Sequence, residues 1–252
     1  MRVIFIHHSC FLVEADEKVL LFDWFAGERV EGYHFGGVLP EYESDTPFYV
    51  FATHKHADHF DMDVLRLADR YTDIHFIFSK DCKMTPRFLE KHGISPAVRD
   101  KITYVGAGEK REVAGVKVET FRSTDAGVAF YVETNGICLY HAGDLNNWRW
   151  EGAGDLINGQ TELNYKVQMK RLSGKKIHLA FLPLDPRLGQ YQSLGMDYFM
   201  EHVDADYIFP MHMWQDYSGI ADFKKKISNA AKADRVVEIK CENQIFEIAV
   251  EN

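Results

Sequence analysis

The chain has 252 residues, which is enough for one large α/β domain or two small ones, and a hydrophobic fraction of 46% is ordinary for a globular protein with a real core. Its formal net charge of −9 argues against a broad basic surface for nucleic acid or for an anionic membrane. We therefore expect neither kind of partner.

The cysteines and the N-terminal residues indicate a cytoplasmic protein. No Cys-x-x-Cys pair occurs, and the thiols lie in apolar contexts, so we expect four buried free cysteines: Cys10, Cys82, Cys138 and Cys241. The apolar run near the N-terminus is short and is soon followed by acidic residues. It is therefore expected to be neither a signal peptide nor a membrane span.

The chain begins with three predicted strands and then a long loop. Buried strands are expected at residues 3–6, 10–14 and 19–22, with Asp23 ending the third. Residues 26–40 contain several glycines and three neighbouring aromatic side chains. A loop of this length is often a lid or a binding loop. Its aromatic residues either cover a substrate or pack on the body of the fold, and the sequence leaves both open.

A dense group of histidines follows the next apolar run, at residues 48–52. His54 and His56 are two apart, so in extended chain both side chains point to the same side. Asp58 and His59 come as the chain turns and can face a second point nearby. Neutral imidazole and carboxylate suit zinc and similar ions. The alternative, a polar loop with chance histidines, fits this spacing poorly, so the sequence predicts a metal site here.

The rest of the chain alternates between predicted strands and helices. A helix capped by Asp61 is expected from residue 62 to 70, and a short one after Thr85. Strands are expected at 75–79, 102–105, 112–114, 116–121, 128–133, 137–141, 179–182, 207–210, 235–239 and 245–250, and helices at 163–172, 196–202 and 220–231. Two similar hairpins, at 11–23 and 130–141, suggest two related α/β halves. Without a linker, we expect a single domain over 1–252.

The H-x-H-x-D-H stretch resembles the metallo-β-lactamase superfamily, and most closely its single-domain branch that includes the ascorbate-lactonase-like proteins. Two further features carry the resemblance: Gly143-Asp144 at the end of a strand, and His212 after the strand at 207–210. The resemblance covers nearly the whole chain. It implies a four-layer αββα sandwich, in which two mixed β-sheets pack face to face with helices outside and metals at one edge.

The resemblance also implies a ligand set for one or two metal ions. His54 and His56 would hold one ion, and a second set would hold the other, with Asp144 between the two ions. The second set comprises Asp58, His59 and His212. Zinc is the first choice and manganese the second, because the ligands include no thiolate to enforce zinc.

One departure from the family pattern concerns the first ion. Most relatives supply a third histidine from the loop before the second hairpin, whereas this loop reads Arg122-Ser123-Thr124-Asp125. Asp125 is the best substitute, because a carboxylate can replace imidazole as a zinc ligand. The alternative is that Asp125 only caps the turn and water takes the third position.

Several other residues are expected near the metals without binding them. The resemblance places Asp23 as a brace for the metal loop, and His8 and His141 beside the ligands or facing the substrate. His8 is a poor ligand candidate and is equally compatible with a structural role at a strand end. Asn147 and Trp148 follow Asp144 and either contact a substrate or pack under the edge of the sandwich.

The function that this reading favours is hydrolysis by a metal-bound hydroxide. Asp58 or Asp144 would orient the hydroxide, and His8 or His141 could protonate the leaving group. The expected substrate is a small ester, lactone or phosphodiester. The alternatives are a metal-binding protein without turnover and a di-iron redox protein, although di-iron relatives carry Glu in place of His56. The oligomeric state is not indicated.

Overall fold

The first strands carry apolar side chains on both faces, so both faces of their sheet must be covered. In the computed structural model, which describes residues 1–250, β1 (Arg2–His7) places Val3 and Phe5 in one core and Ile4 and Ile6 in another. The alternation follows from the two-residue repeat of a strand. One core fills the space between two sheets, and the other lies beneath outer helices.

The first sheet has seven strands in the order β13-β1-β2-β3-β4-β5-β6. The hairpin of β2 and β3 is antiparallel, whereas β3, β4, β5 and β6 run parallel. Besides β1 the strands are β2 (Cys10–Ala15), β3 (Lys18–Phe22), β4 (Phe48–Ala52), β5 (Ile74–Ser79), β6 (Ile102–Val105) and β13 (Gln244–Glu247).

The second sheet has six strands in the order β12-β11-β10-β9-β8-β7. Strands β10, β11 and β12 are parallel, and the others pair antiparallel. They are β7 (Lys110–Val113), β8 (Val116–Arg122), β9 (Val128–Thr134), β10 (Ile137–His141), β11 (Leu179–Pro183) and β12 (Tyr207–Met211). The two similar hairpins noted in the sequence therefore lie in different sheets, one in each half.

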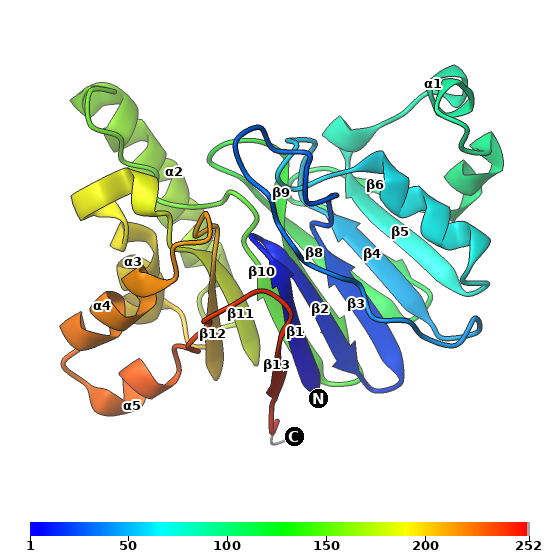
Figure 1. Ribbon diagram of the computed structural model, residues 1–252. Coiled ribbons are helices and arrows are strands. Elements are labelled where there is room, and N and C mark those ends of the chain that lie inside the picture. Colours follow the sequence, from blue (N-terminus) through cyan, green and yellow to red (C-terminus); the bar gives the residue numbers. More distant parts are fainter. Residues whose placement is uncertain (251–252) are drawn as a thin grey trace.

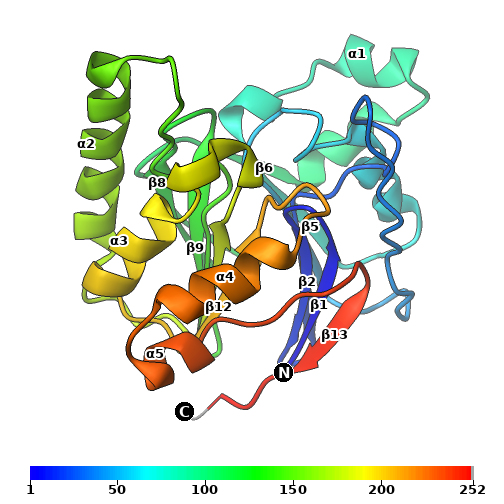
Figure 2. The same ribbon diagram turned by 60° about the vertical axis from the view of Figure 1, so that its left-hand side comes forward.

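Helices cover the outer faces of both sheets (Figures 1 and 2). The second sheet is covered by α2 (Asp155–Leu172), α3 (Leu194–His202), α4 (Ser218–Lys226) and α5 (Ala230–Asp234), and α1 (Pro86–Lys91) lies on the opposite side of the molecule. Short 3-10 helices complete the list: η1 (Met62–Asp69), η2 (Lys80–Cys82), η3 (Pro96–Lys101) and η4 (Pro186–Tyr191). This arrangement confirms the predicted αββα sandwich.

Some predicted elements differ from the observed ones. Residues 235–239 form no strand: they make one isolated bridge, Val236 to Ile208, while Val236 and Ile239 pack into the core between the sheets. Burial alone satisfies their apolar pattern. The helix expected at 220–231 is two helices, and α2 begins at Asp155 rather than 163. Cys241 is exposed, whereas the other three cysteines are buried and free as expected.

None of the helices within residues 1–250 combines the length and the apolar character needed to cross a bilayer.

The strands end along one rim of the sandwich, and the predicted site residues follow directly after them. Thr53 follows β4, and its carbonyl accepts a hydrogen bond of 3.0 Å from Val128 N at the start of β9 in the other sheet. On the same rim His212 N, after β12, donates to His8 O, after β1, at 3.2 Å. The two sheets are thus joined at the place where their loops carry polar side chains.

Candidate metal centre

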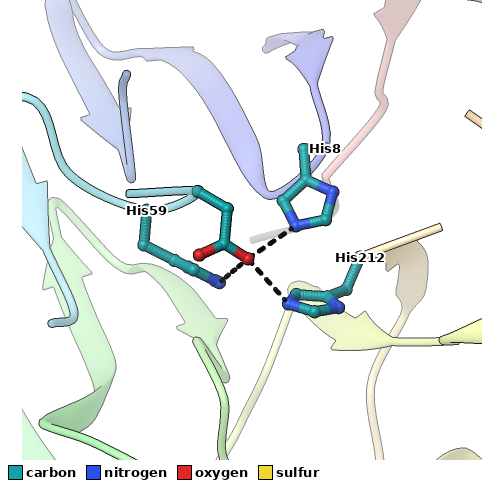
Figure 3. A group of neighbouring side chains, drawn as sticks. His8, His59 and His212 are labelled. Atoms are coloured by element: carbon teal, nitrogen blue, oxygen red, sulfur yellow. Dashed lines mark ion pairs between the residues drawn. The ribbon is translucent and has the colours of Figure 1, made fainter. Parts of the chain in front are cut away.

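Two groups of side chains at this rim have the composition and spacing of metal sites. The first group is His8, Asp58, His59 and His212, and the second group is His54, His56, Asp125 and Asp144. In each group, one ligand atom per residue lies within 4.8 Å of all the others. Figure 3 shows the three histidines of the first group pointing toward one another, with contacts from their Nε2 atoms to a shared carboxylate oxygen, Asp58 Oδ2, at 3.3, 3.7 and 3.5 Å.

Asp144 lies between the two groups. Its Oδ1 is 3.1 Å from His59 Nε2 and 3.4 Å from His212 Nε2, both in the first group. Its Oδ2 is 3.3 Å from His54 Nε2, in the second group. One carboxylate therefore presents one oxygen to each group, which is the geometry that a bridging ligand requires.

Hydrogen bonds at Nδ1, the ring nitrogen that faces away from the centre of the site, orient three of the histidines. Nδ1 of His59 lies 2.8 Å from Asp23 Oδ2, and Nδ1 of His212 lies 2.9 Å from Asp185 Oδ2. An ionised carboxylate only accepts, so each Nδ1 donates. His54 Nδ1 lies 3.0 Å from the Thr53 hydroxyl, which itself donates to Asp23. All three rings thus present Nε2 to the centre of the site, as metal-binding imidazoles do.

The buried atoms at the centre fit a divalent cation. Within residues 1–250, His8 Nε2, His59 Nε2, His212 Nε2 and Asp144 Oδ1 have no hydrogen-bond partner of good geometry, although each is buried. Leaving such a group unpaired costs about 1–3 kcal/mol. Four of them converging on one point is costly for a protein alone, whereas a cation would satisfy all of them at once.

The charge balance of the first group points the same way. Burial opposes protonation of His212, but the Asp144 carboxylate and the hydrogen bond to Asp185 outweigh it and raise its pKa to about 9. Burial would raise the pKa of Asp58, yet His212, His8 and His59 hold it well below its usual range. The carboxylates thus remain ionised and attract positive charge, which a proton or a divalent ion can supply.

The second group is more open to solvent. The His56 and Asp125 side chains are 47% and 53% exposed, whereas His54 is fully buried. Asp125 Oδ2 lies 3.6 Å from His56 Nδ1, close enough for both to face one ion. The structure thus places Asp125 where the missing histidine is expected, and its role as a ligand stays a prediction.

Several of these residues occupy strained backbone. His8, Asp23 and His212 have φ of 45°, 47° and 61°, the left-handed region that residues other than glycine adopt rarely. Each lies directly after a strand, where this conformation turns the side chain inward over the rim. Such strain is typical of sites in which function dictates the conformation.

Two residues play larger parts at the site than the sequence indicated. His8 was expected beside the ligands, but its Nε2 lies among them, and burial together with the charge of His212 lowers its pKa to about 3, so the ring is neutral, as a ligand must be. Asp185 was not singled out. Its position in the chain could have indicated it: Asp185 follows β11, and β11 lies between β10, which precedes Asp144, and β12, which precedes His212.

The model of the beta-lactamase superfamily domain matches residues 2–153, more than half of the chain. The chain belongs to the beta-lactamase superfamily. The resemblance read from the H-x-H-x-D-H motif is therefore confirmed. None of the curated protein sequences matches the chain.

Solved structures share the fold of this superfamily member over most of its length. The metallo hydrolase Igni18 from Ignicoccus hospitalis is 19% identical with a TM-score of 0.62, covering 98% of this chain and 99% of that one. The isothiocyanate hydrolase from Delia radicum gut bacteria is 12% identical with a TM-score of 0.51, covering 99% and 100%. The diiron β-hydroxylase CmlA from Streptomyces venezuelae is 13% identical with a TM-score of 0.53, covering 84% and 45%. At these identities only the fold is shared.

Two other predicted residues, His141 and Asn147, are buried close to the metal centre. Both His141 nitrogens bond the backbone, Nε2 to Ser9 O at 3.0 Å and Nδ1 from Gly143 N at 3.2 Å. His141 therefore supports the loop before Asp144 and is not placed to protonate a leaving group. Asn147 is buried, but the side chain that lies against Gly195 at the start of α3 is that of its neighbour Asn146, so substrate contact by Asn147 stays a prediction.

Trp148 bonds the loop that carries Asp144 and also lines a cavity. Its Nε1 donates to Asp144 O at 2.8 Å, and its ring centroid is 5.6 Å from that of His212. It also lines a cavity of about 270 Å³ next to the second group. The other lining residues come from the Asp125 loop, the loop before α2 and the first half of α2: Thr124, Asp125, Trp150, Ile157, Asn158 and Thr161.

The loop at residues 26–40 mainly packs on the body of the fold. Phe35 is buried, and its ring stacks on His7 with centroids 5.4 Å apart. Glu242 accepts a hydrogen bond from Gly36 N. Two side chains of the loop reach the rim: Tyr33 lies 4.7 Å from the ring of Trp214, and Phe35 lies 5.5 Å from the ring of His8.

The hydrogen bond behind His212 predicts a loss of metal affinity in Asp185→Asn. The amide keeps the shape but loses the charge that holds Nδ1–H, so we expect metal affinity to fall roughly 10–100-fold without loss of the fold. Isothermal titration calorimetry with zinc measures the metal affinity. Asp216→Asn is the control, because Asp216 caps a surface turn at Ser218. Equal affinities in wild type and Asp185→Asn would contradict the supporting role.

Proposed function

We propose that the chain is a metal-dependent hydrolase that holds one or two divalent ions, with zinc as the first choice and manganese as the second. The observation that carries the proposal is the convergence of buried Nε2 and Oδ1 atoms without hydrogen-bond partners, with Asp144 placed between two groups of potential ligands. The nitrogen and oxygen donors without thiolate suit both metals.

When bound, divalent ions lower the pKa of a water molecule and polarise the bond to be broken. The chain's own contribution is orientation. Asp58 and Asp144 stay ionised and can accept a hydrogen bond from an attacking water, holding it in line with the substrate. The Asp58 side chain is 17% exposed, so it lies at the boundary between the buried ligands and solvent.

A covalent route through cysteine has little support. Cys10 is fully buried, and burial raises the pKa of its thiol well above the usual value. Cys138 is also buried, inside β10. Nucleophilic catalysis requires an accessible thiolate, and burial leaves neither thiol placed to attack a substrate.

The substrate we propose is a small ester, lactone or phosphodiester. The cavity of about 270 Å³ beside the second group is of a size for a small molecule, and Trp148 and Trp150 provide an apolar wall. Asp125 opens onto the same cavity, so a substrate bound there would lie against the second group.

A substrate screen with a ligand control tests the proposal. Protein loaded with zinc or manganese is assayed with an aryl ester, a γ-lactone and an aryl phosphodiester. We expect turnover of at least one, loss of turnover with a chelator, and restoration by metal. His56→Ala should lower turnover at least about 100-fold, more than the effect of supporting residues.

The matched control is His75→Ala, because His75 lies half-buried in β5 and bonds Asp73 at 2.9 Å, outside both groups. Metal bound at native stoichiometry without turnover of any substrate would instead identify a metal-binding protein. Activity that survives complete removal of metal would contradict the mechanism.

A further inference from the structure

One cationic side chain lies at the rim of the metal centre. Arg187 Nε is 3.0 Å from both carboxylate oxygens of Asp185, and that carboxylate also accepts from His212 Nδ1 at 2.9 Å. The guanidinium is thus separated from a potential metal ligand by a single shared carboxylate. The side chain is 43% exposed, so it faces solvent at the rim instead of being sealed inside.

Two indole rings hold this guanidinium in place. Its Cζ lies 4.3 Å from the ring centroid of Trp214 and 5.6 Å from that of Trp150. Trp214 in turn lies 4.5 Å from the His8 ring, and Trp150 lines the cavity beside the second group. Arg187 therefore lies between Trp214, which contacts the first group, and Trp150, which lines the cavity.

Part of the guanidinium remains available. The hydrogen bonds of its side chain come from Nε and Nη2 and go to Asp185. No acceptor within residues 1–250 bonds Nη1. A planar guanidinium that is already oriented loses little entropy when it binds a further acceptor, and it matches the geometry of carboxylate and phosphate.

We propose that Arg187 binds an anionic group, a carboxylate or a phosphate, of the small molecule that occupies the cavity. The proposal rests on the proposed function, because it names the class of substrate for the same site. Such a substrate would place an apolar part against Trp148 and Trp150 and its anion on Nη1 of Arg187. The guanidinium supplies a fixed positive charge at this rim, in a protein whose formal net charge is −9.

Binding of model ligands tests the proposal without turnover. The probes are benzoate and phenyl phosphate, with benzamide as the neutral analogue of benzoate. Tryptophan fluorescence reports binding, because three of the chain's four tryptophans lie at this site: Trp148, Trp150 and Trp214. Each probe is titrated into metal-loaded and into chelated protein.

We expect wild-type protein to prefer at least one anion over benzamide in both metal states. Arg187→Gln should weaken anion binding about 10–100-fold, the value of a charge-assisted hydrogen bond, and should change benzamide binding less than twofold. Arg187→Lys keeps the positive charge but loses the planar pair of N–H donors, so it should recover part of the preference for anions over benzamide. A stronger effect on phenyl phosphate than on benzoate would identify phosphate as the group recognised.

The control is Arg171→Gln. Arg171 also lies over an aromatic ring, 5.1 Å from Phe121, but it bonds Gln168 on α2 away from the metal centre. Anion affinity equal in Arg187→Gln and wild type would overturn the proposal, as would equal losses for benzoate and benzamide. Because the readout is binding, absence of hydrolysis would count against the proposed function alone.

Discussion

Asp144→Asn should lose metal from both groups at once. Its two oxygens face His59 and His212 on one side and His54 on the other, so the amide removes a negative charge from both ions. Loss of a residue that only supports a ligand lowers metal affinity roughly 10–100-fold. We expect the metal affinity of each site to fall by more than this in Asp144→Asn, and turnover to fall at least as far. Elemental analysis after gel filtration gives the metal content.

Asp125→Asn is the comparison for this prediction. Asp125 belongs only to the second group and is half exposed, so its loss should weaken one site and leave the other. Circular dichroism should show that both variants keep the fold. Retention of two metal equivalents at native affinity in Asp144→Asn would rule out the bridging position, and unchanged affinities in Asp125→Asn would rule out its assignment as a ligand.

Gly127→Ala should destabilise the fold where the second group is built. A Cβ at this position would lie 2.0 Å from Thr53 O and 2.6 Å from His54 Cβ, and φ is +65°. The left-handed backbone costs about 1–2 kcal/mol and the overpacking about 1–3 kcal/mol more. We therefore expect the free energy of unfolding to fall by about 2–5 kcal/mol and the second site to lose metal affinity, because His54 must move.

Gly136→Ala separates the cost of the left-handed backbone from the cost of overpacking. Gly136 has φ of +81°, but nothing lies within 4 Å of its Cβ position. Its cost should be limited to the backbone term of about 1–2 kcal/mol, with metal affinity unchanged. Urea denaturation of the chelated proteins measures both. Equal losses of stability in the two variants would show that close packing of Gly127 against the metal loop does not contribute.

The superfamily could be predicted from the sequence because the signal of its metal motif is local. His54, His56, Asp58 and His59 fall within six residues, so strand geometry and the following turn are sufficient to place them near two points. The alternation of strand and helix patterns predicted an α/β fold, and the resemblance implied the two-sheet sandwich. These expectations depend on neighbours in the chain, and the observed strands agree with them.

The strand predicted at residues 235–239 was wrong because an apolar pattern indicates that side chains are buried, but does not indicate whether the backbone pairs with another strand. Residues 235–239 have a strand-like apolar pattern, yet Val236 and Ile239 fill the core while the backbone leaves β12 after a single bridge. The short apolar run could pack in either way. Only the arrangement of β12 and the surrounding helices decided between them.

The sequence by itself determined the fold family, the motif at residues 54–59 and the strand-end positions of Asp144 and His212. The tertiary structure alone decided that His8 lies among the potential ligands and that Asp185 connects His212 to Arg187. The reason is distance along the chain: His8 and His212 are 204 residues apart, and they meet because β1 and β12 end at the same rim of two different sheets. That proximity depends on strand order and sheet packing, which no local pattern of residues encodes.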